Sequence, residues 1–433
     1  MNSKEIEQYL IDVQKKELPD GIERELKVHP QEKIKVIMGP RRAGKSFFLY
    51  QIMNKLKKEK KNILYLNFEN TKLFGITFKE IGEIIALNKR LFPEQKDNPV
   101  LFFDEPQNVE LWERTVREFF DEKYNIFISG SSSKLLSKEI YTSLRGRSIS
   151  YLLLPFSFKE FLKAKNFNYS KLLGSEEKIK LLTFLDEYME FGGFPEIVLE
   201  KNKELKIKNI ESYFDLTVYK DIIERHKIKD AILVKWFLKT VASCYSNELS
   251  INKIYLTLKS QGRKISKNEL YNYASIVEDS LFAFYLPKFS HSIRKREPVN
   301  KVYLCDIGFN KLIEANEDKG KKMENIVFLE LQRRKIPAME LFYWKNISRE
   351  EVDFVIKEKF QIKELIQVCC KIDNDTKKRE IRSLLKASKE LKCKNLVIIT
   401  EDYEGETEEE WLGIKGKINY IPLWKWLLEN GHK

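Results

Sequence analysis

The residues that point most directly to chemistry form a glycine-rich segment with the sequence Gly39-Pro40-Arg41-Arg42-Ala43-Gly44-Lys45-Ser46. It follows the apolar run 34–38 and precedes a segment of helical pattern, which is the required setting for the phosphate-binding loop G-x-x-x-x-G-K-[ST]. Its glycines let the backbone turn so that successive N–H groups point at phosphate oxygens, and the following helix adds the positive end of its dipole. In such a loop Lys45 reaches the β- and γ-phosphates, and Ser46 is a ligand of Mg²⁺. The predicted nucleotide contacts are Gly39, Pro40, Arg41, Arg42, Ala43, Gly44, Lys45, Ser46 and Phe47.

A second chemically distinctive pair, Asp104 and Glu105, directly follows the apolar run 100–103. Four consecutive apolar residues are typical of a strand buried on both faces of a parallel sheet, and ligands bind at the carboxyl ends of such strands. We expect Asp104 to hold Mg²⁺ and Glu105 to orient and polarise an attacking water, as phosphoryl transfer requires. An acidic loop after a core strand is the alternative. ATP and Mg²⁺ are therefore the expected cofactors, and ATP hydrolysis is the expected reaction.

Polar residues beside two later strands are candidates for contacts to the transferred phosphate. The strand 124–129 is followed by Ser131 and Ser132, which could hydrogen-bond the γ-phosphate or the water, although serines at such positions also cap helices. Arg145 and Arg147 precede the next apolar run, and a guanidinium on the transferring phosphate has a strong effect on rate. These two arginines are candidate arginine fingers, acting within the subunit or on a neighbour, with surface ion pairing as the alternative.

These motifs resemble those of the AAA+-type ATPases that are common in archaea and in many bacteria. The resemblance extends over nearly the whole chain and rests on the glycine-rich segment, Phe103-Asp104-Glu105-Pro106-Gln107, Ser129-Gly130-Ser131-Ser132-Ser133 and Leu144-Arg145-Gly146-Arg147. It implies that the region 158–229 is a helical lid packed over the nucleotide, with Gly192-Gly193-Phe194-Pro195 as its signature. It also implies a carboxy-terminal domain first catalogued as of unknown function, and it leaves the physiological role open.

Composition restricts the class of protein more than its role. The chain has 433 residues, no apolar run near the roughly 18 residues of a membrane span, and no apolar segment near its amino terminus that would act as a secretory signal. Its five cysteines show no C-x-x-C spacing, which argues against a zinc site or a disulfide framework and predicts a cytoplasmic protein. The net charge of +13 favours a polyanionic partner, although Lys- and Glu-rich surfaces have other causes.

From residue 230 the pattern predicts three helices followed by a hairpin with a basic tip. That order is typical of a winged helix-turn-helix, in which the third helix enters the major groove and the hairpin contacts phosphates. Modules of this shape also bind proteins, so DNA contact and protein docking are both open. The candidate DNA contacts are Lys264, Lys267, Asn268, Asn272, Arg294, Lys295 and Arg296.

The last region, 306–433, is predicted to run helix, three strands, helix and strand, which is the core order of restriction-endonuclease-like folds. Metal-dependent cleavage in such a fold needs an acid on the second strand and a Glu-x-Lys on the third, so that metal ions activate water at a phosphodiester. Asp353 fills the first position, and Glu324 could add a carboxylate from the helix.

The third strand departs from this requirement, because Gln367 and Cys369 stand where Glu and Lys belong. An amide is a poorer Mg²⁺ ligand than a carboxylate, and a thiol cannot replace an ammonium. A degenerate, inactive site is therefore predicted, unless Lys371 supplies the missing ammonium. The acidic run 401–410 is expected to be a solvated loop.

The predicted fold class is α/β, with a P-loop NTPase parallel sheet, a helical lid, a winged helix-turn-helix and a restriction-endonuclease-like α/β domain. The predicted boundaries are 1–157, 158–229, 230–305 and 306–433. The leading functional hypothesis is an ATP-hydrolysing molecular switch that couples nucleotide state to binding of double-stranded DNA or a protein partner. The alternatives are an ATP-gated, metal-dependent nuclease and a non-hydrolysing nucleotide sensor in a regulatory or defence assembly. No membrane partner is expected, and the oligomeric state is open.

Overall fold

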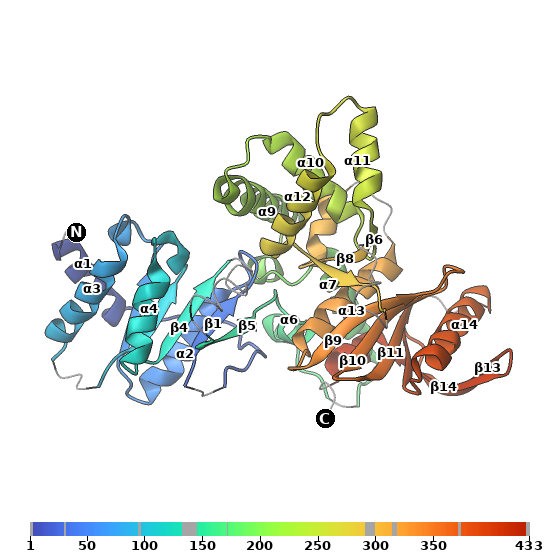
Figure 1. Cartoon of the computed structure of the whole chain (residues 1–433). Coiled ribbons are helices and arrows are strands. Elements are labelled where there is room, and N and C mark those ends of the chain that lie inside the picture. Colours follow the sequence, from blue (N-terminus) through green and yellow to red (C-terminus); the bar gives the residue numbers. More distant parts are fainter. Residues whose placement is uncertain are drawn as a thin grey trace. The chain divides into compact units, whose positions relative to one another are not determined.

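The computed structural model describes residues 3–29, 32–93, 97–131, 144, 146–170, 172–290, 299–313, 318–370 and 374–429 (Figure 1). The chain forms two compact units, Met1–Pro155 with Asp279–Leu281, and Phe156–Glu278 with Phe282–Lys433. Within the described residues, no helix combines the length and the apolar character that a bilayer crossing demands.

The first unit is built on a five-stranded parallel sheet in the order β2-β3-β4-β1-β5. Its strands are β1 (Ile34–Met38), β2 (Ile63–Asn67), β3 (Val100–Asp104), β4 (Ile126–Gly130) and β5 (Ser148–Leu152). Every residue of β1, β3 and β4 is buried, as expected for the central strands of a parallel sheet covered on both faces. The parallel sheet predicted from the apolar runs is confirmed.

Helices cover both faces of this sheet (Figure 1). The helices of one face are α1 (Ser3–Lys15), α3 (Phe78–Leu91) and α4 (Trp112–Asp121), and the opposite face is covered by α2 (Lys45–Lys58). On the α2 side, Leu49 packs with Phe102 and Phe127, whose rings stack with centroids 4.8 Å apart. Since β4 lies between β1 and β3, the segments that follow these three strands emerge at one edge of the sheet.

The second unit begins with helices. They are α6 (Phe158–Ala164), α7 (Ser175–Phe191), α8 (Pro195–Leu199), α9 (Lys203–Leu216) and the π-helical η4 (Thr217–Glu224). The turn between α7 and α8 contains Gly192, with φ +77°, and Gly193. A Cβ atom on Gly193 would lie 2.3 Å from the carbonyl oxygen of Phe156, which explains why a glycine stands there.

Three helices and a hairpin follow in the order expected from the sequence, and a short strand between the first two helices, which the sequence did not predict, adds a third strand to the hairpin. The elements are α10 (Ala231–Ser243), β6 (Asn247–Leu249), α11 (Ile251–Ser260), α12 (Lys267–Asp279), β7 (Ala283–Pro287) and β8 (Asn300–Leu304). Strand β8 is central in this sheet, between β6 and β7. The side chains of Asp230 and Ser250 accept backbone hydrogen bonds at the starts of α10 and α11, so both helices begin at capping residues.

The last part of the second unit is a six-stranded mixed sheet in the order β13-β14-β12-β11-β10-β9. Its elements are α13 (Lys319–Arg333), β9 (Met339–Lys345), β10 (Glu351–Glu358), β11 (Gln361–Cys369), α14 (Asn374–Leu391), β12 (Leu396–Thr400), β13 (Gly405–Trp411), β14 (Ile414–Pro422) and α15 (Leu423–Leu428). Leu384 of α14 packs in one core cluster with Leu365 of β11. Phe328 of α13 packs against Phe354 of β10. The predicted order of helix, three strands, helix and strand is observed.

One sequence prediction in this region is wrong. The acidic run expected to be a solvated loop contains strand β13, which forms an antiparallel hairpin with β14. Glu406, Glu408 and Glu410 are exposed and alternate with half-buried residues, which include Glu409. Lysines of β14 balance the charge: Lys417 pairs with Glu406 at 2.8 Å and Lys415 with Glu410 at 3.5 Å. Cross-strand ion pairs of this kind make an acidic edge strand compatible with a sheet.

Candidate functional site

The glycine-rich segment forms the turn between β1 and α2, and its backbone explains its residue types. Gly44 has φ +93° and lies directly before α2, and Arg42 also has a positive φ of +65°. A Cβ atom on Gly39 would lie 2.0 Å from the carbonyl oxygen of Leu153, the residue after β5. Glycine is therefore required at both ends of the turn: at Gly44 because of the positive φ, and at Gly39 because no space is left for a side chain.

Lys45 is the first residue of α2, and its side chain is buried. Its Nζ atom donates hydrogen bonds of 3.1 Å to the carbonyl oxygens of Gly39 and Pro40 and lies 3.8 Å from Oε1 of Glu105. The ammonium group is thus held inside the turn, beside the carboxylate predicted to orient water.

Asp104, the last residue of β3, accepts hydrogen bonds from three hydroxyl groups. Ser46 Oγ and Tyr65 OH donate to Oδ2 at 2.7 and 2.8 Å, and Ser129 Oγ donates to Oδ1. Burial raises the pKa of Asp104, while the Ser129 hydrogen bond lowers it and the neighbouring Glu105 raises it further. The predicted Mg²⁺ ligands therefore meet, and their hydroxyl and carboxylate oxygens are of the type that this ion prefers.

Glu105 has a left-handed backbone conformation, with φ +53°, that turns its side chain toward β4. Its Oε2 accepts hydrogen bonds of 3.2 Å from the backbone N–H and the hydroxyl of Ser131, and another from Nε2 of Gln107. The structure thus brings Ser131 to the predicted site, in contact with the carboxylate. Its role toward a phosphate stays a prediction, and Ser132 lies outside the described residues.

The arginine candidates are placed differently. Arg147 lies before β5, and its carbonyl oxygen accepts a hydrogen bond from the N–H of Ile34, at the amino end of β1. Its guanidinium pairs with Asp121 at 3.0 Å, at the edge of the sheet opposite to the glycine-rich turn. This placement agrees with the ion-pair alternative and does not bring Arg147 to its own subunit's turn. Arg145 lies outside the described residues, and a finger acting on a neighbouring subunit stays a prediction.

Two contributors to the site, Arg24 and Tyr65, were not named from the sequence, and two others, Gln107 and Ser129, were quoted only within motifs and given no role. Arg24 donates hydrogen bonds to the carbonyl oxygens of Ala43 and Leu154, at 2.8 and 2.5 Å, and so ties the turn to the segment after β5. No local pattern marks Arg24, which lies in an irregular connector. Ser129, in contrast, is a polar residue near the carboxyl end of an apolar strand, and that signal was available.

The candidate DNA-binding residues are only partly described. Lys264, Lys267, Asn268 and Asn272 are exposed at or near the beginning of α12, and Lys267 Nζ lies 5.3 Å from the ring centroid of Tyr255. Arg294, Lys295 and Arg296 lie outside the described residues. Their contact with DNA stays a prediction.

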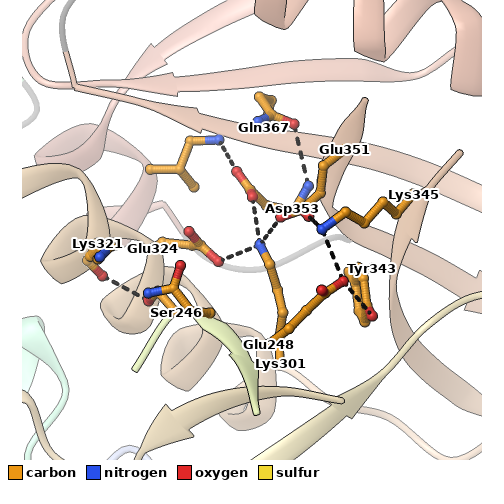
Figure 2. Close-up of polar contacts among 12 residues, drawn as sticks. Ser246, Glu248, Lys301, Lys321, Glu324, Tyr343, Lys345, Glu351, Asp353 and Gln367 are labelled. Carbon is orange, nitrogen blue, oxygen red and sulfur yellow. Dashed lines mark hydrogen bonds and ion pairs between the residues drawn. The ribbon is translucent and has the colours of Figure 1, made fainter. Parts of the chain in front are cut away.

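The predicted vestigial nuclease residues converge on a cation that the sequence did not suggest. Glu324 and Asp353 each accept a 2.9 Å hydrogen bond from Nζ of Lys301, on β8 (Figure 2). Gln367 accepts a 3.3 Å hydrogen bond from the N–H of Asp353 and donates one of 2.6 Å to Glu380. Among the described residues, no group of three or more His, Cys, Asp or Glu side chains is arranged to hold a metal ion.

The sequence is similar to known proteins over almost its full length. It is 41% identical over 406 residues to the uncharacterized protein MJ1544 of Methanocaldococcus jannaschii, covering 93% of this chain and 90% of that protein. This chain and MJ1544 belong to one protein family. An uncharacterized protein of Haemophilus influenzae is 30% identical over 405 residues, covering 92% of this chain and 94% of that protein.

Three family models match successive parts of this family member. The AAA domain model matches residues 31–162, and two models of domains of unknown function match residues 182–319 (DUF8612) and 319–426 (DUF4143). The AAA match covers the five-stranded sheet with the glycine-rich turn, and it supports an ATPase-type, nucleotide-binding unit of P-loop fold. The expected resemblance to AAA+ ATPases is confirmed for this unit.

Solved structures with similar architecture include the Orc1 protein of Aeropyrum pernix in complex with DNA, at 11% identity and a TM-score of 0.31, covering 72% of this chain and 91% of that one. AMPPCP-bound DnaA of Aquifex aeolicus is 17% identical with a TM-score of 0.23, covering 56% of this chain and 81% of that one.

Proposed function

We propose that this protein binds ATP with Mg²⁺ and hydrolyses it. The observation that carries the proposal is the convergence of Lys45, Ser46, Asp104 and Glu105 at one edge of a parallel sheet. A glycine-rich turn without a ligand would not need a buried lysine beside two buried carboxylates, because buried charges are costly unless they are paired or used.

The residues would divide the work of phosphoryl transfer. Backbone N–H groups of the turn and the amino end of α2 bind the phosphates, and Lys45 exchanges its carbonyl partners for phosphate oxygens. Ser46 and Asp104 would hold Mg²⁺, which when bound supplies charge that neutralises the phosphates. Glu105, fixed by Ser131, accepts a hydrogen bond from the attacking water and orients it toward the phosphate.

ATP binding and phosphate release, measured on the same variants, test this proposal. Lys45→Ala should lose ATP binding, whereas Glu105→Gln should keep binding and release phosphate roughly 10²-fold more slowly, the loss expected when a group acts mainly in the transition state. Glu110→Gln, which removes an exposed carboxylate outside the site, is the matched control and should behave like wild type. Phosphate release by Glu105→Gln at the wild-type rate would refute the role of Glu105. ATP binding by wild type without release would favour the nucleotide-sensor alternative.

The second part of the proposal is that nucleotide state controls binding of double-stranded DNA by the elements α10 to β8, as a winged helix. Support comes from the order of these elements, from the exposed Lys264, Lys267 and Asn268 at the start of α12, and from the net charge of +13. A cytoplasmic location is a further prediction, and the oligomeric state is open.

Electrophoretic mobility shifts over a series of salt concentrations, with and without ATP, test the DNA proposal. Removing the charges of Lys264 and Lys267 should weaken binding and lower the salt dependence, because fewer counterions are released. Lys239→Ala, on an exposed position of α10, is the control. An alanine triple variant at positions 294–296 tests the tip of the hairpin. Binding unchanged in both sets of variants would leave a protein partner as the remaining alternative.

A further inference from the structure

Lys301 is a fully buried lysine surrounded by acids. It lies on the central strand β8, and Nζ contacts Glu324 on α13 at 2.9 Å, Asp353 on β10 at 2.9 Å and Glu351 on β10 at 2.6 Å (Figure 2). An ammonium group has three N–H donors, and here each has a carboxylate acceptor at charge-assisted distance. The ammonium is therefore saturated by ligands from two separate elements of the fold.

Two of the acids around Lys301, Glu324 and Asp353, are those that the sequence predicted as metal ligands, and both contact its ammonium group. Glu324 comes from the helix and Asp353 from the second strand, the two elements that the sequence predicted as the sources of metal ligands. The register between β9 and β10 shifts between Val352 and Val355, and such irregularities re-aim side chains next to functional sites. The second oxygen of Asp353 accepts a 2.9 Å hydrogen bond from the N–H of Val368 on β11, which fixes the carboxylate toward Nζ.

The charges indicate that Lys301 stays ionised. Burial alone would lower its pKa, but Asp353 and Glu324 raise the pKa well above the usual value. Burial and the proximity of Asp353 raise the pKa of Glu324, whereas Lys301 and Lys345 hold the pKa of Glu351 below its usual value against the effect of burial. The cluster thus contains a permanent internal cation that offsets its carboxylates.

The remaining nuclease position is also occupied by internal partners. Gln367 stands on the third strand where a carboxylate would complete a metal site, and both ends of its amide are used, by the N–H of Asp353 and by Glu380. Arg379 in turn pairs with Glu380 at 2.6 Å. The polar groups that would face a metal and its water are therefore hydrogen-bonded to one another.

We propose that the Lys301 ammonium is the resident cation of this site, in the place that a divalent metal ion would take. The site consequently binds no metal and cuts no phosphodiester in the wild-type protein. The function of the Lys301 cluster is to hold β8 against α13 and β10, so that the elements α10 to β8 and the carboxy-terminal sheet form one body. This inference does not depend on ATP hydrolysis.

Mn²⁺ titrations of the full-length protein test the proposal, with bound Mn²⁺ counted by electron paramagnetic resonance and stability measured by thermal unfolding. Lys301→Ala should unfold at a lower temperature without metal, bind additional Mn²⁺, and regain thermal stability as the metal binds. The double variant Lys301→Ala with Asp353→Asn should show neither the additional Mn²⁺ binding nor the recovery of thermal stability. Lys345→Ala is the matched control, because Lys345 contacts Glu351 from outside the centre, at 3.0 Å, and should gain no Mn²⁺ site.

Two results would overturn the proposal. One is a folded Lys301→Ala variant that binds no more Mn²⁺ than wild type. The other is wild-type protein that binds Mn²⁺, or cleaves plasmid DNA with Mg²⁺ or Mn²⁺, in a way that Asp353→Asn abolishes. The second comparison needs no Lys301 variant, so it decides the question even if Lys301→Ala does not fold. Wild type and Asp353→Asn both keep Asp104, so a difference in Mn²⁺ binding between them cannot come from the predicted nucleotide site.

Discussion

Ser46 and Asp104 are 58 residues apart in the sequence, and the hydroxyl of Ser46 donates a 2.7 Å hydrogen bond to Oδ2 of Asp104. The contact joins the start of α2, the helix that follows β1, to the end of β3, and β4 separates β1 from β3 in the sheet. It places a hydroxyl and a carboxylate where one cation can take both as ligands. The order of the parallel sheet brings these residues together, because the carboxyl ends of β1, β4 and β3 lie side by side at one edge.

The first prediction concerns this pair. Ser46→Ala should weaken ATP binding in the presence of Mg²⁺ by at least roughly tenfold, a loss typical even of outer partners of a metal site. Binding measured with a chelator should change much less, because the turn and Lys45 bind phosphate without the hydroxyl. Ser46→Thr, which keeps the hydroxyl, is the control. Equal losses with and without Mg²⁺ would contradict a ligand role for Ser46.

The second prediction concerns the hydrogen bond between Ser131 and Glu105. Ser131→Ala removes the hydroxyl donor but keeps the backbone N–H donor, so Glu105 is less firmly oriented. We expect kcat for ATP hydrolysis to fall about tenfold, the size of one hydrogen bond to a charged group, with ATP affinity unchanged. Single-turnover kinetics measure the effect. A change in affinity alone would instead place Ser131 on the phosphate.

The third prediction tests the close approach at Gly193. Gly193→Ala forces a methyl group to within 2.3 Å of the carbonyl oxygen of Phe156, so backbone must move. The variant should lose at least about 2 kcal/mol of unfolding free energy, a typical cost of an overpacked site. Gly82→Ala, whose added Cβ meets only a side-chain atom at 3.9 Å inside α3, should be neutral or stabilising. Chemical denaturation of both variants provides the comparison.

The fourth prediction concerns pH. Burial raises the pKa of Asp306 to about 7, although the N–H groups of Gly193 and Gly308 donate to its oxygens at 2.7 and 2.8 Å and lower it. A folded-state pKa above the unfolded value means that the folded protein binds more protons than the unfolded protein between pH 4 and 7. The contribution of Asp306 is therefore most favourable at low pH and is lost as the pH rises through about 7.

Asp306→Asn isolates this contribution, since asparagine does not ionise. From pH 5 to pH 8, wild type should lose about 2 kcal/mol of unfolding free energy relative to the variant, given the shift of pKa from an ordinary carboxyl. Denaturant titrations at several pH values supply the measurement. A difference that is constant with pH would show that Asp306 keeps an ordinary pKa.

The sequence was most informative where one short segment contains both the chemistry and the geometry. The glycine-rich turn, Asp104 and Glu105 could be predicted because a loop of fixed spacing and a strand end determine side-chain placement over a few residues.

Lys301 could not be predicted, because its partners follow it by 23 and 52 residues and lie on other elements. Its local sequence is that of an ordinary strand, where an isolated lysine is normally exposed. Arg24 was missed for a similar reason, and the acidic strand β13 because its lysine partners lie on the next strand. Pairings made by tertiary structure leave no local pattern.

Strand β8 also has a mechanical consequence. Leu304 lies three residues after Lys301 on β8, and its backbone N–H and carbonyl both form hydrogen bonds with the buried side chain of Asn325 on α13. Strand β8 is therefore held at both ends, near its start by the ion pairs of Lys301 and at its end by the amide of Asn325. These contacts couple β8 to α13 and β10, so we expect a displacement of β8 to be transmitted to the carboxy-terminal sheet.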